Sequence, residues 1–330
     1  MLKKFVGVIA LFAAVSLRAG ILYVTPEGGG DGTSWDSAIT LSAALAGLSQ
    51  EGTDAVELRL KSGVHYLSAK TTVKQPLTIR GGYDGSEGEA STPTLDKYAT
   101  VISGDTAKNN VWAHVDPVTG AKELALDGDG AVIPVIKDGA LNLPPAYTGK
   151  YDVYYPAVSN NGAVNETTGD VSGFITSSGA ATSGVSIEIL LENITLSGFT
   201  GNIVQLGSDS NHKTTVRATN MAVVGSSATT CFYSTNWGDW TVGNGVDAKF
   251  NKFATSFFYE DCAINPNTWS ATKLESIYSG ERSSDKSWGL GMACRRKGLQ
   301  IDGCSFAPVH EDDGQAGLGG ACRRNQLHVQ

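Results

Sequence analysis

The feature that most constrains this chain is a pair of closely similar segments near its end. Residues 289–296 read Gly-Leu-Gly-Met-Ala-Cys-Arg-Arg, and residues 317–324 read Gly-Leu-Gly-Gly-Ala-Cys-Arg-Arg, 28 residues later. Each copy is followed at the same interval by a short apolar segment, at residues 299–301 and 327–329. A fixed repeat of this length is typical of solenoids, in which each repeat stacks on its neighbours. The pattern therefore predicts two successive coils of a repetitive fold.

Composition indicates that the coils are made of strands. Charged residues make up 18% of the chain, which also has 40 glycines and 10 prolines; an average soluble domain has about 25% charged residues. Low charge with abundant glycine favours short strands joined by tight turns. Apolar and polar residues alternate at 56–60, and further strand patterns follow at 77–83 and 100–105 without an intervening helical pattern. This spacing predicts a coil of strands rather than alternating strands and helices.

One amphipathic helix is predicted near the N-terminus. Apolar residues recur there with helical spacing, at Ala38, Leu41, Leu45 and Leu48. Ser34 or Asp36 is the expected N-cap, and Gly52 lies beyond the expected end of the helix. Such a helix suits the cap of a repeat array, whose first repeat would otherwise expose its core.

Several motifs of residues 21–105 resemble the N-terminal region of bacterial surface β-helix proteins. The motifs are Tyr-Val at 23–24, Gly-Thr-Ser-Trp at 32–35, Ala-Ala-Leu at 43–45, Leu-Thr-Ile-Arg-Gly-Gly-Tyr at 77–83 and Ile-Ser-Gly-Asp at 102–105. Those proteins belong to the pectin-lyase-like group and include relatives of the chlamydial polymorphic outer-membrane proteins. The GGA and FxxN motifs of the latter appear at 319–321 and 199–202. The resemblance implies an all-β chain folded as a right-handed parallel β-helix with an N-terminal capping helix.

The first residues have the pattern of a secretory signal. Lys3 and Lys4 precede an apolar run over residues 5–17, which is too short and wrongly flanked for a membrane-spanning helix. We assign residues 1–19 to a signal peptide in preference to a short membrane anchor. The mature protein is therefore expected to be exported, either secreted or at the cell surface or outer membrane, with no integral membrane segment.

The rest of the chain is expected to divide into three regions. Residues 20–105 hold the cap and the first coils, and residues 106–184, rich in glycine, asparagine and aspartate, form an excursion from the solenoid. Residues 185–330 hold further coils, in which Ile194, Met221, Cys262 and Cys304 follow similar polar residues and are predicted to be equivalent inward positions. The chain stops within the second tandem copy, so we expect missing C-terminal coils or a partner that covers the open end.

Acidic residues supply the candidates for catalysis and for metal binding. Asp312 and Asp313 lie beside His310. Polygalacturonases combine paired aspartates with Asn-Thr-Asp, Gly-His-Gly and Arg-Ile-Lys motifs, and this chain has none of the three. We therefore favour a solvated turn at this position. Asp127 and Asp129 are candidates for calcium, which needs several oxygen ligands. A plain Asp-Gly turn is the favoured alternative. We expect no cofactor, with calcium as the one ion left open.

A ligand surface and a disulfide are the remaining candidates. Trp237 and Trp240 could stack on a sugar, and burial in the core is an equal alternative. Arg295 and Arg323 occupy matching positions of the tandem copies and could bind an anionic glycan, although we favour solvated turns. Cys294 and Cys322 also match, and strands about 5 Å apart would permit a disulfide or leave two stacked thiols.

The net charge of −8 argues against nucleic acid or an anionic membrane as a partner, because both require a basic surface. We predict a non-catalytic exported protein of the cell surface or medium, adhesive or structural, with polysaccharide or a host or neighbouring cell surface as its partner. The alternative is a carbohydrate-active enzyme, a polysaccharide lyase or glycoside hydrolase, on the pectin-lyase-like fold.

Overall fold

The protein is mostly β-structure, with parallel sheets, as its composition predicts. The computed structural model describes the following residues: 20–49, 52–86, 92–115, 121–144, 153–166, 168, 170–177, 187–207, 214–234, 238–243, 246–249, 251–260, 269–272, 275–277, 292–293 and 299–302. Over these residues it contains 26 strands and one helix, α1 (Leu41–Gly47).

The largest sheet, sheet A, has eight parallel strands. In sheet order they are β1 (Gly20–Val24), β2 (Val56–Lys61), β5 (Leu77–Tyr83), β14 (Ile187–Glu192), β17 (Thr214–Thr219), β20 (Gly238–Gly243), β23 (Trp269–Thr272) and β26 (Leu299–Asp302). Their register aligns Leu58 with Ile79 and Ile79 with Leu191, all three fully buried. One face of sheet A is therefore a continuous apolar row.

Two further parallel sheets have six strands each. Sheet B consists of β3 (Gly63–Tyr66), β6 (Thr100–Ser103), β15 (Thr195–Ser197), β18 (Ala222–Val224), β21 (Asp247–Lys249) and β24 (Glu275–Ile277). Sheet C consists of β4 (Thr71–Thr72), β13 (Ile175–Thr176), β16 (Asn202–Leu206), β19 (Ser227–Ser234), β22 (Lys252–Glu260) and β25 (Met292–Ala293).

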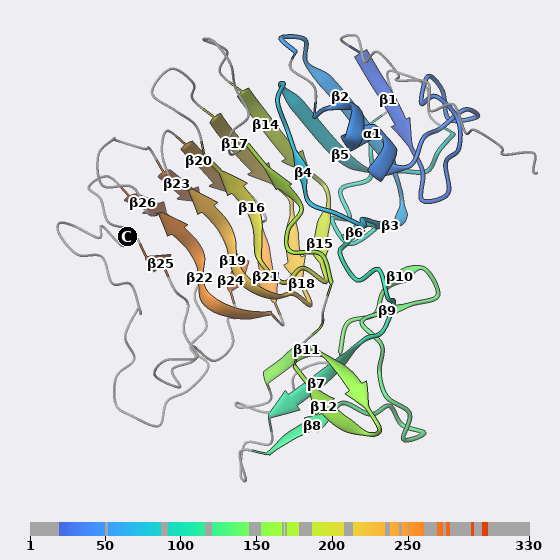
Figure 1. Cartoon of the computed structure of the whole chain (residues 1–330), viewed down its shortest axis with the longest axis vertical. Helices are drawn as coiled ribbons and strands as arrows, with labels where there is room; N and C mark the ends of the chain where they lie inside the picture. The colour runs from blue at the N-terminus through green and yellow to red at the C-terminus, as the bar shows by residue number, and fades with distance from the viewer. Residues whose placement is uncertain are drawn as a thin grey trace, which may run out of the picture.

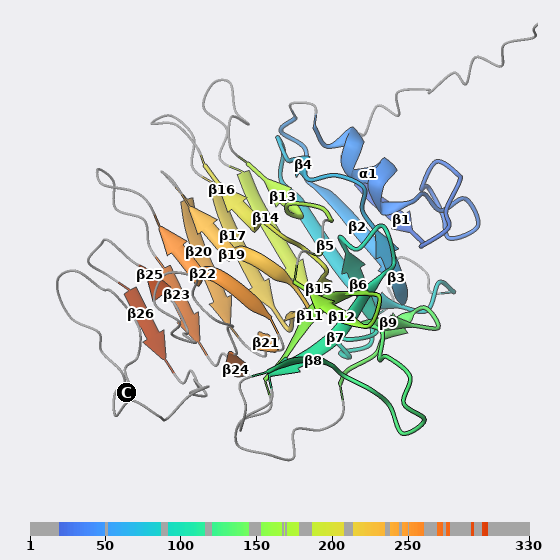
Figure 2. The same ribbon diagram turned by 60° about the horizontal axis from the view of Figure 1, so that its bottom comes forward.

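The chain visits the three sheets in a fixed order. From β2 onward, the strands of the parallel sheets follow the sequence A, B, C, and this cycle repeats up to β26. Each strand pairs with the strand of the preceding and following cycle, so the strands stack along one direction (Figures 1 and 2). Parallel neighbours require a crossover connection, and here the other two sheets provide that crossover.

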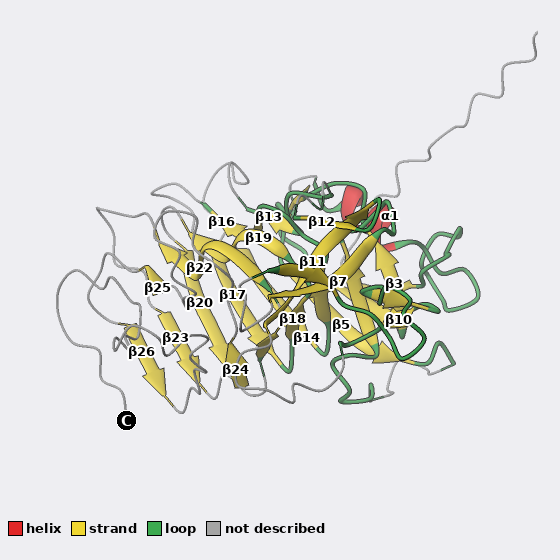
Figure 3. Cartoon of the chain, turned by 90° about the horizontal axis from the view of Figure 1, so that it is seen from below, coloured by secondary structure: helices red, strands yellow, loops and turns green. Residues whose placement is uncertain are grey.

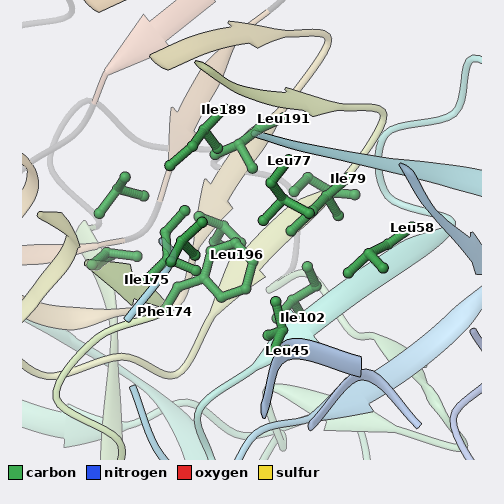
Figure 4. Close-up of a cluster of buried hydrophobic side chains, with 14 of the residues drawn as sticks. Leu45, Leu58, Leu77, Ile79, Ile102, Phe174, Ile175, Ile189, Leu191 and Leu196 are labelled. Atoms are coloured by element: carbon green, nitrogen blue, oxygen red, sulfur yellow. The ribbon is translucent and has the colours of Figure 1, made fainter. Parts of the chain in front are cut away.

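Apolar side chains of all three sheets meet in one core (Figure 4). Leu191 of sheet A, Leu196 of sheet B and Ile175 of sheet C belong to the same cluster, and all three are fully buried. Phe174 and Phe199 add a pair of tilted rings from successive cycles, with centroids 6.2 Å apart. Each such side chain contributes about 1.5–3 kcal/mol through burial, and the repeated rows extend this contribution along the stack.

Helix α1 covers the first edges of sheets B and C. It bears the buried residues Leu41, Ala44 and Leu45, and Figure 1 places it beside β1 and β2. The Ser42 hydroxyl donates to the Tyr66 carbonyl of β3 at 3.3 Å, and the amide of Lys74, just after β4, donates to the Leu48 carbonyl at 3.2 Å. The outermost strands β3 and β4 are thus protected at this end.

The predicted N-cap of this helix is wrong. Thr40 caps α1, because its side chain accepts a hydrogen bond from the Ala43 amide. Ser34 and Asp36 lie too early, since Ile39 forms an isolated parallel bridge with Val24 and its amide donates to the Tyr23 carbonyl. This extended pairing prevents a helical start before residue 40.

A separate β unit, which we call the insertion (residues 104–174), interrupts the cycle between β6 and β13. It contains a four-stranded antiparallel sheet in the order β12-β11-β7-β8 and a small hairpin of β9 and β10. The bounds are β7 (Asn110–Val115), β8 (Lys122–Leu124), β9 (Ile136–Lys137), β10 (Ala140–Leu141), β11 (Val153–Asn160) and β12 (Ala163–Asn165). The excursion predicted at 106–184 extends too far, because β13 pairs with β4 and β16 within sheet C.

The insertion packs on the outer face of sheet B. Ile102, Leu196 and Val223 fill the core, so strand alternation turns Ala222 and Val224 outward. There Trp112 and Val135 of the insertion cover them, and we call this contact the seam. The Trp112 ring nitrogen donates to the Asn142 carbonyl at 2.6 Å. Figure 3 shows β7 and β11 crossing the parallel strands.

The corner after sheet A repeats in detail. Asn193 and Asn220 have left-handed φ angles of 54° and 46°, and the Asn220 side-chain nitrogen donates to the Asn193 side-chain oxygen at 2.7 Å. The next residues, Ile194 and Met221, are fully buried in the core, as predicted. Cys262, the third predicted position, lies outside the described residues, and its equivalence stays a prediction.

Candidate functional site at the neck of the insertion

Many residues proposed from the sequence lie outside the described part of the chain. These are His310, Asp312, Asp313, Trp237, Arg295, Arg323, Cys294, Cys304 and Cys322, together with the signal segment 1–19. Their proposed roles stay predictions.

Asp127 is held inside a turn. Its carboxylate accepts hydrogen bonds from the amides of Asp129 and Ala131 at 3.0 and 2.9 Å, and its carbonyl accepts one from Gly130 at 3.0 Å. The Asp129 side chain is exposed. Within the described residues no group of three or more histidine, cysteine, aspartate or glutamate side chains is arranged to hold a metal ion. The favoured Asp-Gly turn accounts for both aspartates.

A hollow of about 220 Å³ lies beside this turn. It is lined by Asp127, Ile133, Pro134, Lys137, Asn142 and Leu143. Leu143 is 42% exposed there, whereas the Asp127 carboxylate is already bound to the turn amides. The hollow is therefore mainly apolar at its rim, with one cation.

Trp240 lies at a register position that sheet A otherwise fills with core residues. It pairs with Val216, which pairs with Ile189, and Ile189 pairs with Leu77. These three partners are at most 2% exposed. The side chain of Trp240 is not among those described, and its proposed role stays a prediction.

Two aspartates meet where the insertion leaves and rejoins the sheets. Asp105 follows β6, and Asp170 precedes β13. Their carboxyl groups are within hydrogen-bonding reach of each other, although the two residues are far apart in the sequence. The Val171 amide donates to the Gly104 carbonyl at 3.2 Å, which joins the same two segments through the backbone. We call these paired segments, residues 104–110 and 170–173, the neck.

Asp105 is fixed by the backbone around it. Its two carboxylate oxygens accept hydrogen bonds from the amides of Asn109 and Asn110, each at 3.1 Å, and its own amide donates to the Ser103 hydroxyl at 3.2 Å. The side chain is nearly fully buried. Gly198 lies directly against it, and a Cβ there would approach the Asp105 Cβ to 2.9 Å. The position of the Asp105 carboxylate is thus determined by both the neck and β15.

Asp170 is the member of the pair that retains a proton. Its pKa is raised to about 7, first because burial disfavours its charge and then because Asp105 lies beside it as a hydrogen-bond partner and a like charge. A hydrogen bond from the Ala107 amide opposes this shift in pKa. One oxygen, Oδ2, is buried without a hydrogen-bond partner.

The charged neighbours of the pair are engaged elsewhere. The Lys108 ammonium lies 4.5 Å from the centroid of the Tyr66 ring, and the Lys70 ammonium donates to Gln205 at 2.7 Å. Burial, and next the charge of Asp105, raises the pKa of Tyr66. Burial lowers the pKa of Lys70. The pair therefore relies on its proton rather than on a nearby cation.

The geometry of the pair limits its chemistry. A carboxyl group with a pKa near 7 suits general acid catalysis, but glycosidases hold their two carboxyl groups at least about 5 Å apart to accommodate the sugar or water between them. Two hydrogen-bonded carboxyl groups are closer than that. The arrangement is suited to sharing a proton across the neck.

Sequence reasoning missed this pair. Asp105 ends the Ile-Ser-Gly-Asp motif at 102–105, but the sequence around Asp170 has no periodicity or motif that marks it as a partner. Their contact depends on the insertion returning to the point where it began, which neither segment encodes locally.

The outer face of sheet A contains a network of ion pairs. Arg80 of β5 donates to Glu57 of β2 at 3.2 Å and to Glu192 of β14 at 2.7 Å, so it joins three successive cycles. Arg59 adds a second bond to Glu57 at 2.9 Å, and Arg217 pairs with Glu188 at 2.7 Å. These charges bind neighbouring strands to each other.

Comparisons with protein-family models, curated protein sequences and solved structures found no match to this chain. Among the described residues, no helix has the length and apolar character needed to span a membrane.

Proposed function

We propose that the three sheets form one right-handed parallel β-helix capped by α1. The proposal is supported by the repeated A, B, C order of the strands, by their parallel pairing from cycle to cycle and by the single core between them. Parallel crossover connections are right-handed in almost all proteins, about 98% of cases. The resemblance of residues 21–105 to β-helix proteins of the pectin-lyase-like group points the same way.

The role proposed for this β-helix is non-catalytic: an exported adhesive or structural protein, secreted or at the cell surface. The observation that carries it is the ion-pair network on the outer face of sheet A. Glu57 and Glu192 are bound by Arg80, and their side chains are 25% and 27% exposed. Carboxylates bound in this way stiffen the stack of strands in sheet A, and they are not free to act on a substrate.

A polysaccharide or another cell surface is the proposed partner. The test is a screen of the full chain against acidic and neutral polysaccharides, with and without calcium, that records binding and product formation separately. Saturable binding without products is the expected result. Release of oligosaccharides at a catalytic rate would overturn the non-catalytic role.

A carbohydrate-active enzyme is the second candidate, because Asp170 has a pKa near neutrality beside a second carboxyl group. In that case turnover would be lost in Asp170→Asn and kept in Asp138→Asn. Asp138 is a suitable matched control, since it is exposed in the turn between β9 and β10 with a left-handed φ of 51° that asparagine accepts. Equal turnover in both variants would exclude Asp170 as the acid.

A further inference from the structure

Three aromatic side chains pack together on the outer face of sheet A. Leu22 and Val24 of β1 belong to the core, so strand alternation turns Tyr23 outward. The Tyr23 ring lies 4.9 Å from the Trp35 ring, and the Trp35 ring lies 5.8 Å from the Tyr83 ring, measured between centroids. Among the described residues, none of the three aromatic side chains belongs to a hydrophobic core cluster. We call this group the aromatic cluster.

Trp35 is the member of the aromatic cluster that reaches the solvent. Tyr23 and Tyr83 are 6% and 1% exposed, whereas Trp35 is only partly buried. The Arg59 guanidinium lies over the Tyr83 ring, 5.6 Å from its centroid, and is itself bound to Glu57 at 2.9 Å. The Trp35 indole therefore contacts two buried rings, so a ligand that binds its exposed part has little side-chain motion to restrict.

The loop that carries Trp35, residues 28–39, is built to hold a fixed shape. The Gly30 amide donates to the Ala38 carbonyl at 2.9 Å, which joins the two arms of the loop. A Cβ on Gly30 would collide with the backbone of Ser37, so glycine is required for the arms to lie this close. Figure 1 shows this loop beside β1 and α1, at the end of the stack opposite β26.

The same loop exposes a carboxylate and several hydroxyl groups. Oδ1 of Asp31 accepts hydrogen bonds from the Thr33 amide at 3.0 Å and from the hydroxyls of Thr33 and Ser37 at 2.8 and 2.9 Å. Asp31, Thr33 and Ser34 are exposed, and within the described part of the chain no hydrogen bond engages Oδ2 of Asp31. The Thr33 amide, and next the hydroxyls of Thr33 and Ser37, lower the pKa of Asp31, so its carboxylate is ionised at neutral pH. The loop thus holds an acceptor in a fixed position.

A partly exposed indole and a fixed carboxylate in one loop fit a sugar ring. A pyranose has apolar C–H groups on its faces and hydroxyls at its edge, so it can stack on an indole while a hydroxyl donates to a carboxylate. The charges favour a neutral sugar, because residues 25–40 contain Glu27, Asp31 and Asp36 but no lysine or arginine. An acidic polymer would be repelled by this loop.

We propose that Trp35 and Asp31 form a subsite for a neutral, hydroxyl-rich polysaccharide. The inference rests on the proposed function, for which it names the class of ligand and the point of contact. Sugar rings stack on the exposed part of the Trp35 indole, and their hydroxyls donate to the Asp31 carboxylate. Binding changes no covalent bond.

A binding screen of the full chain on immobilised polysaccharides tests the class of ligand. The neutral probes are laminarin, mannan and xyloglucan, and the acidic probes are polygalacturonate and alginate. Binding to at least one neutral probe is expected, with an affinity that changes by less than about twofold between low and high salt, because an uncharged ligand is not subject to screening. Binding confined to the acidic probes would overturn this inference and leave the proposed function standing. Binding to none of the probes would overturn the polysaccharide partner as well.

Variants of the loop locate the subsite. Trp35→Leu keeps apolar bulk against Tyr23 and Tyr83 and should weaken binding of the neutral probe about tenfold, whereas Trp35→Phe, which keeps an aromatic face, should retain most of the affinity. Asp31→Asn keeps an acceptor for the loop but loses the charge, and should weaken binding about threefold. The matched control is Tyr98→Leu, because Tyr98 is a partly buried ring that packs against the seam; it should bind like the unmodified protein. Equal affinity in Trp35→Leu and the unmodified protein would overturn the subsite while the proposed function stands.

The indole N–H resonance of Trp35 in the unmodified protein provides a measurement that does not depend on how Trp35→Leu folds. Trp35→Phe assigns this resonance, which should shift on titration with the bound neutral polysaccharide and share the midpoint of the binding curve. The indole resonance of Trp112, whose ring nitrogen donates to the Asn142 carbonyl, should not shift. A Trp35 resonance that stays in place while the polysaccharide binds would overturn the subsite even if Trp35→Leu fails to fold.

Discussion

The parallel sheets and the insertion are stabilised in different ways. In the sheets, Leu58, Ile79 and Leu191 repeat one buried position in successive strands, and each supports the next. The insertion instead rests on the seam, where Trp112 and Val135 contact Ala222 and Val224, and on the neck. Repetition spreads stability over many similar contacts, whereas the attachment of the insertion is concentrated in a few side chains.

The two regions also respond differently to acid. The sheets contain His65, nearly fully buried, whose Nε2 donates to the Lys61 carbonyl at 2.8 Å and whose Nδ1 has no partner. Burial lowers the pKa of His65 to about 4. Protons therefore destabilise the sheets near β3, whereas at the neck, where the pKa of Asp170 is raised, they stabilise the folded form.

Removing the Trp112 side chain is expected to have the largest effect and to separate the two regions. Trp112→Ala should cost about 3–5 kcal/mol, typical for a fully buried tryptophan. Because the cost falls on the seam, hydrogen exchange should show the insertion strands opening while β14 and β17 stay protected. If β14 and β17 lose protection by the same factor as the insertion strands, the insertion and the parallel sheets unfold as one unit.

His65 should make the stability of the sheets depend on pH. Its folded pKa lies below the unfolded value of about 6.5, so the unfolded chain binds the proton first. Stability is fully present above about pH 6.5 and falls by about 3 kcal/mol as the pH drops to about 4.

Denaturant unfolding monitored between pH 4 and 7 measures this loss. His65→Gln, which does not titrate, should reduce the slope of stability against pH over this range. An unchanged slope in that variant would assign the acid sensitivity to other groups.

The ion pair of Arg217 and Glu188 should matter least. Both side chains are more than half exposed, at 55% and 60%, so Arg217→Gln is expected to cost less than about 1 kcal/mol. The cost should disappear at high salt, which thermal unfolding at two ionic strengths can measure. A loss comparable to that of Trp112→Ala would mean that the outer face, rather than the core rows, sets the stability of the sheets.

The sequence is most informative where the structure repeats. Alternation at 56–60 predicts β2, and the shared pattern around Ile194 and Met221 predicts equivalent core positions. The same apolar pattern occurs in strands of all three sheets, however, so spacing alone does not show to which sheet a strand belongs. The cap at Thr40 is missed because the bridge between Val24 and Ile39 is a tertiary contact.

The candidate site is less predictable than the fold. Asp127 and Asp129 are recognisable as a turn because their spacing is local. Asp105 and Asp170 become neighbours only when the insertion closes on itself, and Trp112 finds its partners on a different sheet. Neither contact produces a periodic pattern in the sequence, so local sequence patterns cannot predict these contacts.

The way the first strands are covered gives the stack a direction. Helix α1 occupies the edges of sheets B and C, and the loop before it occupies that of sheet A, since the Tyr23 amide donates to the Gly32 carbonyl and the Thr25 amide to the Ile39 carbonyl. Among the described residues, the first strand edges therefore offer a second molecule fewer free backbone groups on which to continue the sheets. Addition of strands at this end of the stack is accordingly disfavoured.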